Sequence, residues 1–546
     1  MAYLTRTQTG QPVLILSEGA TRNRGEEAQR NNIMAAKVIG EVIRSTLGPV
    51  SMDKMLVSSI GDITITNDGA AILDEIDVEH PAAKMIVEVA KTQDDMVGDG
   101  TTTAVVLSGE LLEEAEKLLE QNIHPTLIVS GYRKASQRAL EFLAKMSEKV
   151  DLNDKETLKK VARTAMGSKA IGIAQEHFAD IAIGAVGKIA EKRGDKWVVD
   201  IDNIQIVKKE GKSLQDTKLI SGIILDKEVV HPGMAKSMER AQIALVNTSL
   251  EVKKTEVSAE IRIRNPAQIK EFLDQEANML KNMVEKIKKA NASVLICSKG
   301  IDDMAKHFLS KEGILAVERA SDSDMEKLSR ATGGKIVTNL EDLKPEDMGY
   351  AELVEERKIS DDKMVFIEGC KNPKSVSILI RAGLERMVDE AERAMHDALS
   401  VIADVFEKNE VVVGGGAVES EVAKKLQEYA VQIGGREQLA VEAFAKSLEI
   451  IPKTLAENAG LEQIDIMVEL RSAHDKPKGY LMGVDVFTGE IGNMYEKGVI
   501  EPLSVKEQAI KSASEASSMI LRIDDVISGG KVEAPPGGPG GMPPEY

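Results

Sequence analysis

The spacing of apolar residues changes twice along the 546 residues of the chain. Up to about residue 150, and again from about 405, long amphipathic runs such as 110–119 and 437–455 predict helices. Between about 220 and 370, short apolar runs such as 243–246 and 293–297 predict strands that alternate with helices. Together these patterns predict an α/β domain inserted into a mostly helical domain that both chain ends build.

Composition narrows the class of protein further. The chain has 70 basic and 89 acidic side chains, and its net charge of −19 argues against nucleic acid and anionic membranes as partners. No apolar run is long enough to span a bilayer, and the first residues lack a signal-peptide core, so we expect a cytoplasmic protein. Cys297 and Cys370 are expected to be buried, reduced thiols, because two cysteines in a chain of this length make no disulfide framework.

One short motif combines more features of a ligand-binding site than any other. Residues 97–103 place Asp99 between Gly98 and Gly100, directly before a predicted helix that starts with three threonines. Glycines allow close approach of the backbone to a ligand, a helix start suits anionic oxygens, and a carboxylate suits Mg²⁺. An ordinary Asp-Gly turn with a threonine cap explains the heptapeptide alone equally well.

Other glycine-bearing turns share this character. Residues 64–69 and 413–417 each lie where a predicted strand meets a predicted helix, and residues 46–49 close a helix that ends near Ser45. The chain has no G-x-x-x-x-G-K-[ST] and no G-x-G-x-x-G motif. If the chain binds a nucleotide, it does so with a different loop design.

Taken together, these motifs resemble those of the chaperonin family, and the archaeal group II branch, the thermosomes, fits best. The resemblance begins with Leu-Gly-Pro at 47–49, Asn-Asp-Gly at 67–69, Gly-Asp-Gly-Thr-Thr at 98–102 and Gly-Gly-Gly at 414–416. It continues through 53–56, 80–85, 354–357, 451–460 and 522–527. It covers nearly the whole chain, from about Gly10 to about Gly530, with the motifs in the family's order.

The resemblance implies a multidomain α/β and α+β chaperonin fold with three domains. Residues 1–150 and 405–546 would form a mostly helical equatorial ATPase domain, and 151–220 with 371–404 a small hinge-like intermediate domain. Residues 221–370 would form an α/β apical domain that binds substrate, with a helical lid protrusion at about 251–282. A helix packed on its own domain is the plainer interpretation of the second half of that protrusion, where apolar residues recur at helical spacing after Asn265 and Pro266.

The resemblance also assigns a site for ATP and Mg²⁺. Asp99 would bind the metal, and Asp397, helped by Asp68, would orient the attacking water as the catalytic carboxylates. The nucleotide would be bound by Leu47, Gly48, Pro49, Asn67, Gly69, Gly100, Thr101, Thr102, Thr103, Gly415 and Gly416, with Asp485 and Glu496 near ribose and adenine. Lys169 corresponds to a lysine that senses the γ-phosphate.

Two of these residues look ordinary without the resemblance. Asp397 lies off the apolar stripe of its predicted helix, beside Arg393, which is typical of a solvated carboxylate. Lys169 lies in a predicted loop, where a surface lysine is the plain expectation.

The chain departs from the family pattern beside the predicted site. Val50 and Ser51 follow Gly48-Pro49 where the family usually has Lys-Gly, and Ala71 replaces a common threonine. The segment 381–385 is less glycine-rich than its counterpart in the family. All three carboxylates are present, so we expect an active ATPase; a structural ring subunit with weak ATPase activity is the alternative that Val50 and Ser51 motivate. No motif supports a third class, an α/β enzyme of small metabolites.

The resemblance implies partners as well. The chain would assemble, with itself or with paralogues, into two back-to-back rings of about eight subunits each, a closed symmetry that buries contact surfaces. Unfolded or misfolded proteins would be the clients, and the built-in lid would make a separate lid co-chaperonin unnecessary. Residues 534–546 are rich in proline and glycine, so we expect a disordered tail that projects into the cavity or ends as a plain floppy terminus.

Overall fold

A computed structural model of the chain describes residues 3–6, 12–15, 21–252, 266–370 and 374–528. The predicted tail at 534–546 and residues 253–265 of the predicted lid therefore lie outside the described residues.

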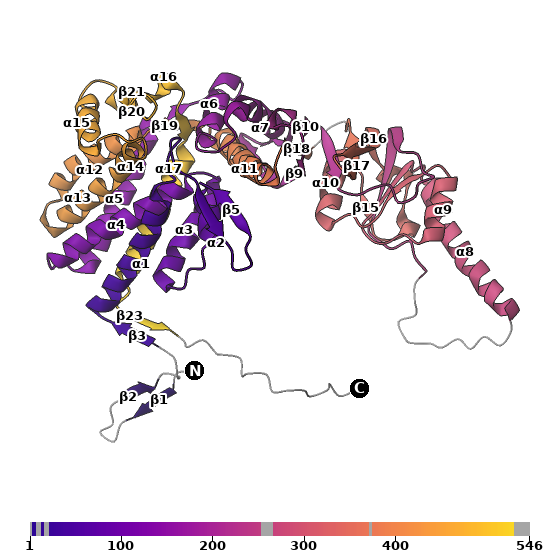
Figure 1. Cartoon of the computed structure of the whole chain (residues 1–546), viewed down its shortest axis with the longest axis horizontal. Coiled ribbons are helices and arrows are strands. Elements are labelled where there is room, and N and C mark those ends of the chain that lie inside the picture. The colour runs from indigo at the N-terminus through magenta and orange to yellow at the C-terminus, as the bar shows by residue number, and fades with distance from the viewer. Residues whose placement is uncertain (1–2, 7–11, 16–20, 253–265, 371–373, 529–546) are drawn as a thin grey trace.

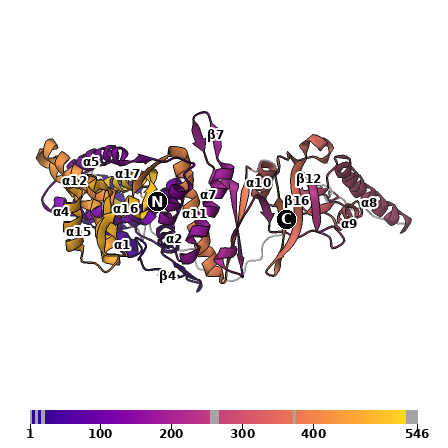
Figure 2. The same cartoon turned by 90° about the horizontal axis from the view of Figure 1, so that it is seen from above.

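The described elements form three groups along the long axis of the molecule (Figure 1). Both chain ends meet in the first, here called the chain-end group (21–149 and 410–528). The chain then passes through a middle group (155–220), forms a sheet group (222–368) at the far end, and returns through the middle group (376–408). The same order is seen from above (Figure 2). The predicted arrangement, a helical part from both chain ends with an inserted α/β part, is present, whereas the predicted domain boundaries stay a prediction.

Helices dominate the chain-end group. They are α1 (Glu26–Arg44), α2 (Gly69–Glu75), α3 (Pro81–Val97), α4 (Thr101–Glu120), α5 (Pro125–Met146), α12 (Ala417–Ile433), α13 (Gly435–Leu448), α14 (Ile450–Asn458), α15 (Gln463–His474), α16 (Met494–Lys497) and α17 (Leu503–Leu521). Its strands are short: β3 (Thr21–Arg24), β4 (Lys54–Val57), β5 (Ile63–Thr66), β6 (Glu148–Lys149), β19 (Glu410–Val413), β20 (Met482–Asp485), β21 (Glu490–Asn493), β22 (Ile500–Pro502) and β23 (Asp525–Ser528). Strands β1 (Tyr3–Arg6) and β2 (Pro12–Ile15) precede the group and pair with each other.

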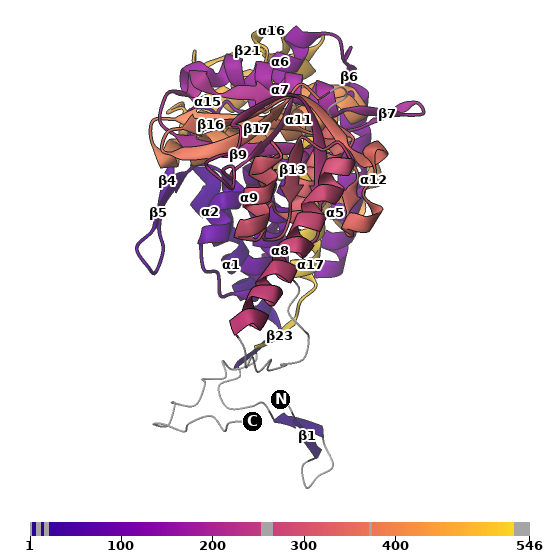
Figure 3. The ribbon, with the colours of Figure 1, turned by 90° about the vertical axis from the view of Figure 1, so that its right-hand side faces the viewer.

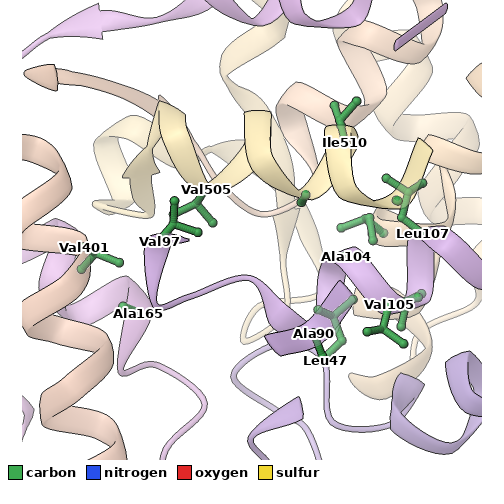
Figure 4. Packing of buried hydrophobic residues seen from close by; sticks show 14 of the residues in the cluster. Leu47, Ala90, Val97, Ala104, Val105, Leu107, Ala165, Val401, Val505 and Ile510 are labelled. Atoms are coloured by element: carbon green, nitrogen blue, oxygen red, sulfur yellow. The ribbon is translucent and has the colours of Figure 1, made fainter. Parts of the chain in front are cut away.

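Helix α4 lies at the centre of this group and contacts α1, α3, α13 and α17. Its first half, residues 101–109, is small or aliphatic on every side, as a helix surrounded by other helices requires. Gly40 of α1 and Gly109 of α4 let the two helices approach closely, since a Cβ on Gly40 would lie 3.5 Å from Gly109 Cα. Figure 4 shows the apolar packing beside the start of α4, where Val97 lies next to Val505 of α17.

The run 437–455, predicted as one helix, forms two. Helix α13 ends at Leu448 and α14 begins at Ile450. Pro452 explains the break, because a continuous helix would direct its ring against the carbonyl of Leu448. At the third position of a new helix the proline fits, since the backbone N–H that it lacks would have no partner there.

Both passages of the chain, outward and returning, contribute elements to the middle group. It contains α6 (Lys155–Ala165), α7 (Gln175–Ile189), α11 (Glu385–Lys408), β7 (Glu191–Arg193), β8 (Lys196–Val198), β9 (Ile204–Glu210), β10 (Lys218–Ile220) and β18 (Val376–Ala382). Strand β18 lies between β10 and β9 in a three-stranded sheet, antiparallel to β10 and parallel to β9. The long helix α11 contacts both α6 and α7. Its buried side chains join the same apolar core as those of the chain-end group.

A seven-stranded mixed sheet forms the far group. Its strands are β11 (Gly222–Leu225), β12 (Ser237–Val246), β13 (Val294–Cys297), β14 (Leu315–Val317), β15 (Ile336–Val337), β16 (Gly349–Ile359) and β17 (Asp362–Glu368). The order is β11-β17-β16-β12-β13-β14, and β15 also pairs with β12. Strands β11 and β13 are buried along their whole length, as their uninterrupted apolar runs predict.

Helices α8 (Pro266–Lys289), α9 (Asp303–Lys311) and α10 (Asp322–Thr332) complete the sheet group. Seen end-on, α8 and α9 lie side by side in front of the other elements (Figure 3). Helix α8 begins at Pro266, as predicted, and Leu280, Val284 and Ile287 are buried in the core of the sheet group. The plainer interpretation of this stretch, a helix packed on its own domain, is therefore confirmed for the second half of α8.

The sheet group has its own core, separate from that of the other two groups. A small cluster lies at the junction and joins β9 and β18 to β11 and β17 through Val207, Ile224, Met364, Phe366 and Leu379. In the part of the chain that the structure describes, no helix is long and apolar enough to cross a membrane.

Aromatic residues make up only 3% of the chain, so each buried ring carries much of the local packing. Phe444 of α13 is fully buried and meets Tyr132 of α5 edge to face, with the ring centroids 5.5 Å apart. We expect Phe444→Ala to lower the free energy of unfolding by about 3–5 kcal/mol, because it leaves a cavity between α5 and α13. Urea unfolding measures this loss. The matched control is Phe487→Ala, at a ring that is 78% exposed, and an equal loss there would contradict the prediction.

Candidate functional site

A cavity of about 650 Å³ lies between the chain-end group and the middle group. Its walls come from the turns after α1 and before α2, the starts of α4 and α12, the loop after α6, and α11. All the predicted site residues line it except Gly69 and Glu496: Leu47, Gly48, Pro49, Asn67, Asp68, Asp99, Gly100, Thr101, Thr102, Thr103, Lys169, Asp397, Gly415, Gly416 and Asp485. The fold therefore brings together segments that are hundreds of residues apart.

The two exceptions have different local reasons. Gly69 packs behind the wall, where a Cβ would lie 2.7 Å from the hydroxyl oxygen of Thr102. Glu496 is exposed and accepts a hydrogen bond from Asn493, 2.9 Å away. Its neighbour Lys497 lines the cavity instead and pairs with Asp485.

The loop between α3 and α4 presents Asp99 to the cavity. Gly98 and Gly100 on either side of it both have left-handed backbones, with φ of 63° and 77°. The buried amide of Gln93 donates to the backbone carbonyls of Asp99 (2.9 Å) and Val505 (3.2 Å), which fixes the loop against α17. Helix α4 begins without a side-chain cap, so its first N–H groups remain for a ligand. Thr101, Thr102 and Thr103, which follow Gly100, also line the cavity.

A second helix start faces the same cavity. Helix α12 follows Gly416, whose φ is 74°, and it too has no side-chain cap. Neither Gly415 nor Gly416 has room for a side chain: a Cβ would lie 2.7 Å from Met494 Sδ or 2.7 Å from Pro452 Cβ, respectively. Two helices therefore begin at the cavity on left-handed glycines, which places two partly positive helix ends around one volume.

Gly98 has a second role that the sequence did not indicate. A Cβ on this residue would lie 2.2 Å from Ser400 Cβ, so only glycine lets α11 approach the loop this closely. Asp397 lies one turn before Ser400 on α11. The absence of a side chain at Gly98 thus helps to bring Asp397 to the cavity.

Lys169 joins two carboxylates from different elements. Its ammonium nitrogen lies 3.0 Å from Asp68 Oδ1 and 3.2 Å from Asp397 Oδ2. The other oxygen of Asp68 accepts from Ala71 N (2.9 Å) and caps α2. The Lys169 side chain is 3% exposed and that of Asp397 10%. The expectations of a surface lysine and of a solvated carboxylate, drawn from the local pattern alone, were therefore wrong. The polar face of α11, which carries Asp397, is covered by the turn before α2 and the loop after α6.

The environment shifts the pKa values of these groups in different directions. Burial raises the pKa of Asp68, but the Lys169 charge and the Ala71 N–H outweigh it, so the pKa is lowered. Burial raises the pKa of Asp397 well above its ordinary value, against the opposing charge of Lys169. Burial and the charge of Glu501 raise the pKa of Asp99 to about 7.

Sequence reasoning missed a buried ionic group beneath the cavity. Lys506 of α17 lies 2.9 Å from Glu419 and 2.8 Å from Glu501, and all three side chains are at most 15% exposed. Lys506 and Glu501 line the cavity, and Glu501 Oε1 would lie 2.4 Å from a Cβ on Gly414. The local pattern gave no signal for it, because Glu507 and Gln508 follow Lys506 directly in α17 as they would on a solvated face.

The donor set suits a hard divalent cation. Three aspartates and a glutamate line this part of the cavity (Asp68, Asp99, Asp397 and Glu501), beside the ammonium groups of Lys169 and Lys506. Carboxylate oxygens are the ligands that Mg²⁺ prefers. A second set, Asp94, His396 and Asp397, also places one ligand atom of each within 4.8 Å of the others.

These features define a class of protein: a multidomain chain whose cleft, with two uncapped helix starts and several carboxylates beside them, suits a phosphate group with its metal ion. The family model of the TCP-1/cpn60 chaperonin family matches residues 39–531. The chain is 57% identical over 530 residues to thermosome subunit beta of Sulfolobus acidocaldarius, covering 97% of this chain and 96% of that protein. It is 59% identical over 524 residues to the thermosome subunit of Pyrococcus horikoshii, covering 96% and 95%.

The chain belongs to the TCP-1/cpn60 chaperonin family. The resemblance stated from the sequence, the predicted fold class and the predicted function of a group II chaperonin subunit are thereby confirmed.

The close approach at Gly98 can be tested by substitution. Gly98→Ala places a methyl group against Ser400 and a side chain on a left-handed backbone, so we expect a loss of about 2–4 kcal/mol in the free energy of unfolding. Gly460→Ala is the matched control, because Gly460 has a similar φ of 73° with nothing within 4 Å of its Cβ position, and should cost about 1 kcal/mol. Urea unfolding of both variants makes the comparison. Equal losses would contradict the contact, and Ser400→Gly added to Gly98→Ala should restore part of the difference.

Proposed function

We propose that the chain is a Mg²⁺-dependent ATPase subunit of a chaperonin, in which ATP binding and hydrolysis drive enclosure of unfolded proteins. The observation that carries the proposal is the meeting of Asp68, Lys169 and Asp397 at a cavity that also receives the uncapped start of α4. The chaperonin family membership and the similarity to thermosome subunits support the same reaction.

The glycine-started helices would hold the phosphates. Anionic oxygens would accept hydrogen bonds from the free N–H groups at the start of α12 and at Thr101, Thr102 and Thr103. Both helix dipoles favour negative charge there. Gly48 and Pro49 would cover the nucleotide from the turn after α1. Asp485 would lie near the ribose or adenine, and Lys497, which pairs with it, would hold it in place.

Asp99 would hold the metal ion, while Asp68 would help Asp397 to orient the attacking water. When bound, Mg²⁺ supplies charge neutralisation across the phosphates and lowers the cost of the developing negative charge. Asp99 faces the cavity beside the first N–H groups of α4, so one wall would contact both the metal and the phosphate oxygens.

Asp397 would orient the attacking water from the opposite wall. It reaches the cavity from α11, whereas Asp99 and the helix starts belong to the chain-end group. Lys169 balances the charges of Asp397 and Asp68 and holds both carboxylates within 3.2 Å of one nitrogen, which fixes their separation. Because phosphoryl transfer depends on positioning and charge, this set needs no covalent nucleophile.

The wider proposal follows the three-domain division predicted from the sequence. The chain would assemble into a double ring, with itself or with paralogues, and close its chamber with its own protrusion at about 251–282. Exposed apolar side chains on and beside the β4–β5 hairpin, which projects from the body in Figure 3, support contact with a neighbouring subunit: Met52, Met55, Val57 and Ile60. Two free, buried cysteines suit the reducing cytosol that we propose as its location.

The alternative, a structural ring subunit with weak ATPase activity, rested on Val50, Ser51 and Ala71. Neither Val50 nor Ser51 is among the residues that line the cavity. Ala71 contributes its backbone N–H to Asp68, which any residue except proline would supply. These positions therefore weaken the alternative, and a measurement of turnover decides between the two.

We expect steady-state ATP hydrolysis that requires Mg²⁺ and falls at least 100-fold in kcat in the Asp397→Asn variant, because the amide neither attracts the water proton nor pairs with Lys169. Nucleotide binding should persist, since the helix starts are unchanged. Asp389→Asn is the matched control on the same helix: this half-exposed carboxylate pairs with Lys208 at the surface, and its loss should leave turnover within about twofold.

Electron microscopy of the same preparations shows whether the ring is intact. No turnover by the native chain in an intact ring would overturn the ATPase assignment and favour the structural subunit. Equal losses in the Asp397→Asn and Asp389→Asn variants would remove Asp397 from its proposed role.

A further inference from the structure

The turn that carries Asp68 is tied to α11 at a second point, away from the cavity. The Asp68 backbone N–H donates to the hydroxyl oxygen of Thr66 (3.1 Å), and that hydroxyl donates to Glu390 Oε2 (3.3 Å). Arg393 donates to the same oxygen from Nε (3.1 Å) and Nη2 (2.9 Å). A continuous hydrogen-bonded path therefore runs from the backbone of Asp68 to α11.

The directions of these bonds are fixed by the chemistry of the groups. A backbone N–H can only donate, so the Thr66 oxygen must accept from Asp68. The single hydroxyl proton of Thr66 is then free to point at the Glu390 carboxylate, which as an anion can only accept. Thr66 is 1% exposed and Glu390 5%, so water does not compete well for either group.

Helix α11 thereby holds the turn in two places. Glu390 and Asp397 are seven residues apart, which is about two helical turns and puts both on one face of α11. Asp397 reaches the side chain of Asp68 through Lys169, and Glu390 reaches its backbone through Thr66. Neither Thr66 nor Glu390 lines the cavity, so neither is placed to contact the nucleotide.

We propose that Thr66 and Glu390 are positioning residues for ATP hydrolysis: they fix the Asp68 backbone relative to α11 and so set the distance between the Asp68 and Asp397 carboxylates. This inference rests on the proposed ATPase function. It assigns a role in the chemical step to a buried strand residue and to a carboxylate outside the cavity. Misplacement of a catalytic group by about 1 Å can cost up to 100-fold in rate, so a small displacement of the turn has a measurable effect.

Thr66→Val tests the path because valine keeps the shape of threonine without its hydroxyl. We expect kcat for ATP to fall by about 10-fold while KM changes less than about threefold, since the glycine-started helices are untouched. Thr66→Ser keeps the hydroxyl and should recover most of the native kcat. Thr64→Val, the same change two residues earlier on β5, is the matched control, and its kcat should stay within about twofold of native.

A double-mutant cycle with Glu390→Gln tests whether the two residues act together. If they do, Thr66→Val should lower kcat much less in the Glu390→Gln background than in the native chain. If the native chain hydrolyses ATP and kcat is unchanged in the Thr66→Val variant, this inference is overturned while the proposed function stands. Strictly additive effects of the two substitutions on log kcat would have the same meaning. A native chain without turnover would overturn the proposed function, and this inference with it. Urea midpoints of all variants show whether a loss of rate accompanies a loss of folding.

Discussion

Lys169 carries its charge into a region where its side chain is 3% exposed, and Asp68 and Asp397 hold it there. Burial of an unpaired ammonium group costs several kcal/mol, so the lysine is stable in this position only while both carboxylates remain beside it. Asp68 lies 101 residues earlier in the chain and Asp397 on the returning helix α11. The turn before α2, the loop after α6 and α11 must therefore meet at one point, and the shape of the cavity follows from that meeting.

The opposite wall depends on backbone rather than on side chains. Gly100 and Gly416 adopt left-handed conformations that start α4 and α12 at the cavity without a side-chain cap. The charged side chains beneath that wall are mostly carboxylates, which alone would repel phosphate. In the proposed site the helix ends would attract anionic oxygens, and the carboxylates would attract the cation that accompanies them.

Much of this site could be predicted because its residues fall in short motifs with a chemical reason. Asp99 between two glycines and the three glycines at 414–416 are local patterns, and the structure brings them to one cavity. The burial of Asp397 and Lys169 was not predictable from local patterns, because the elements that cover them come from distant segments. The Gly98–Ser400 contact and the buried position of Lys506 also depend on how α11 and α17 pack, which no local pattern contains. The break between α13 and α14, by contrast, has a local signal in the sequence, which is Pro452.

The junction between the middle group and the sheet group has a mechanical consequence. The chain-end and middle groups share one apolar core, whereas the sheet group is joined to them through a cluster of five buried side chains around Phe366 and through polar pairs such as Lys209–Asp362 and Arg330–Asp200. This joint buries far fewer apolar side chains than the large cores on either side of it. The far end of α8 lies at the opposite end of the long axis from the helices of the chain-end group (Figure 1). The molecule therefore has the proportions of a lever: a rotation at Phe366 too small to disturb either core would be amplified, in proportion to the length of the arm, into a wide sweep at the outer end of α8.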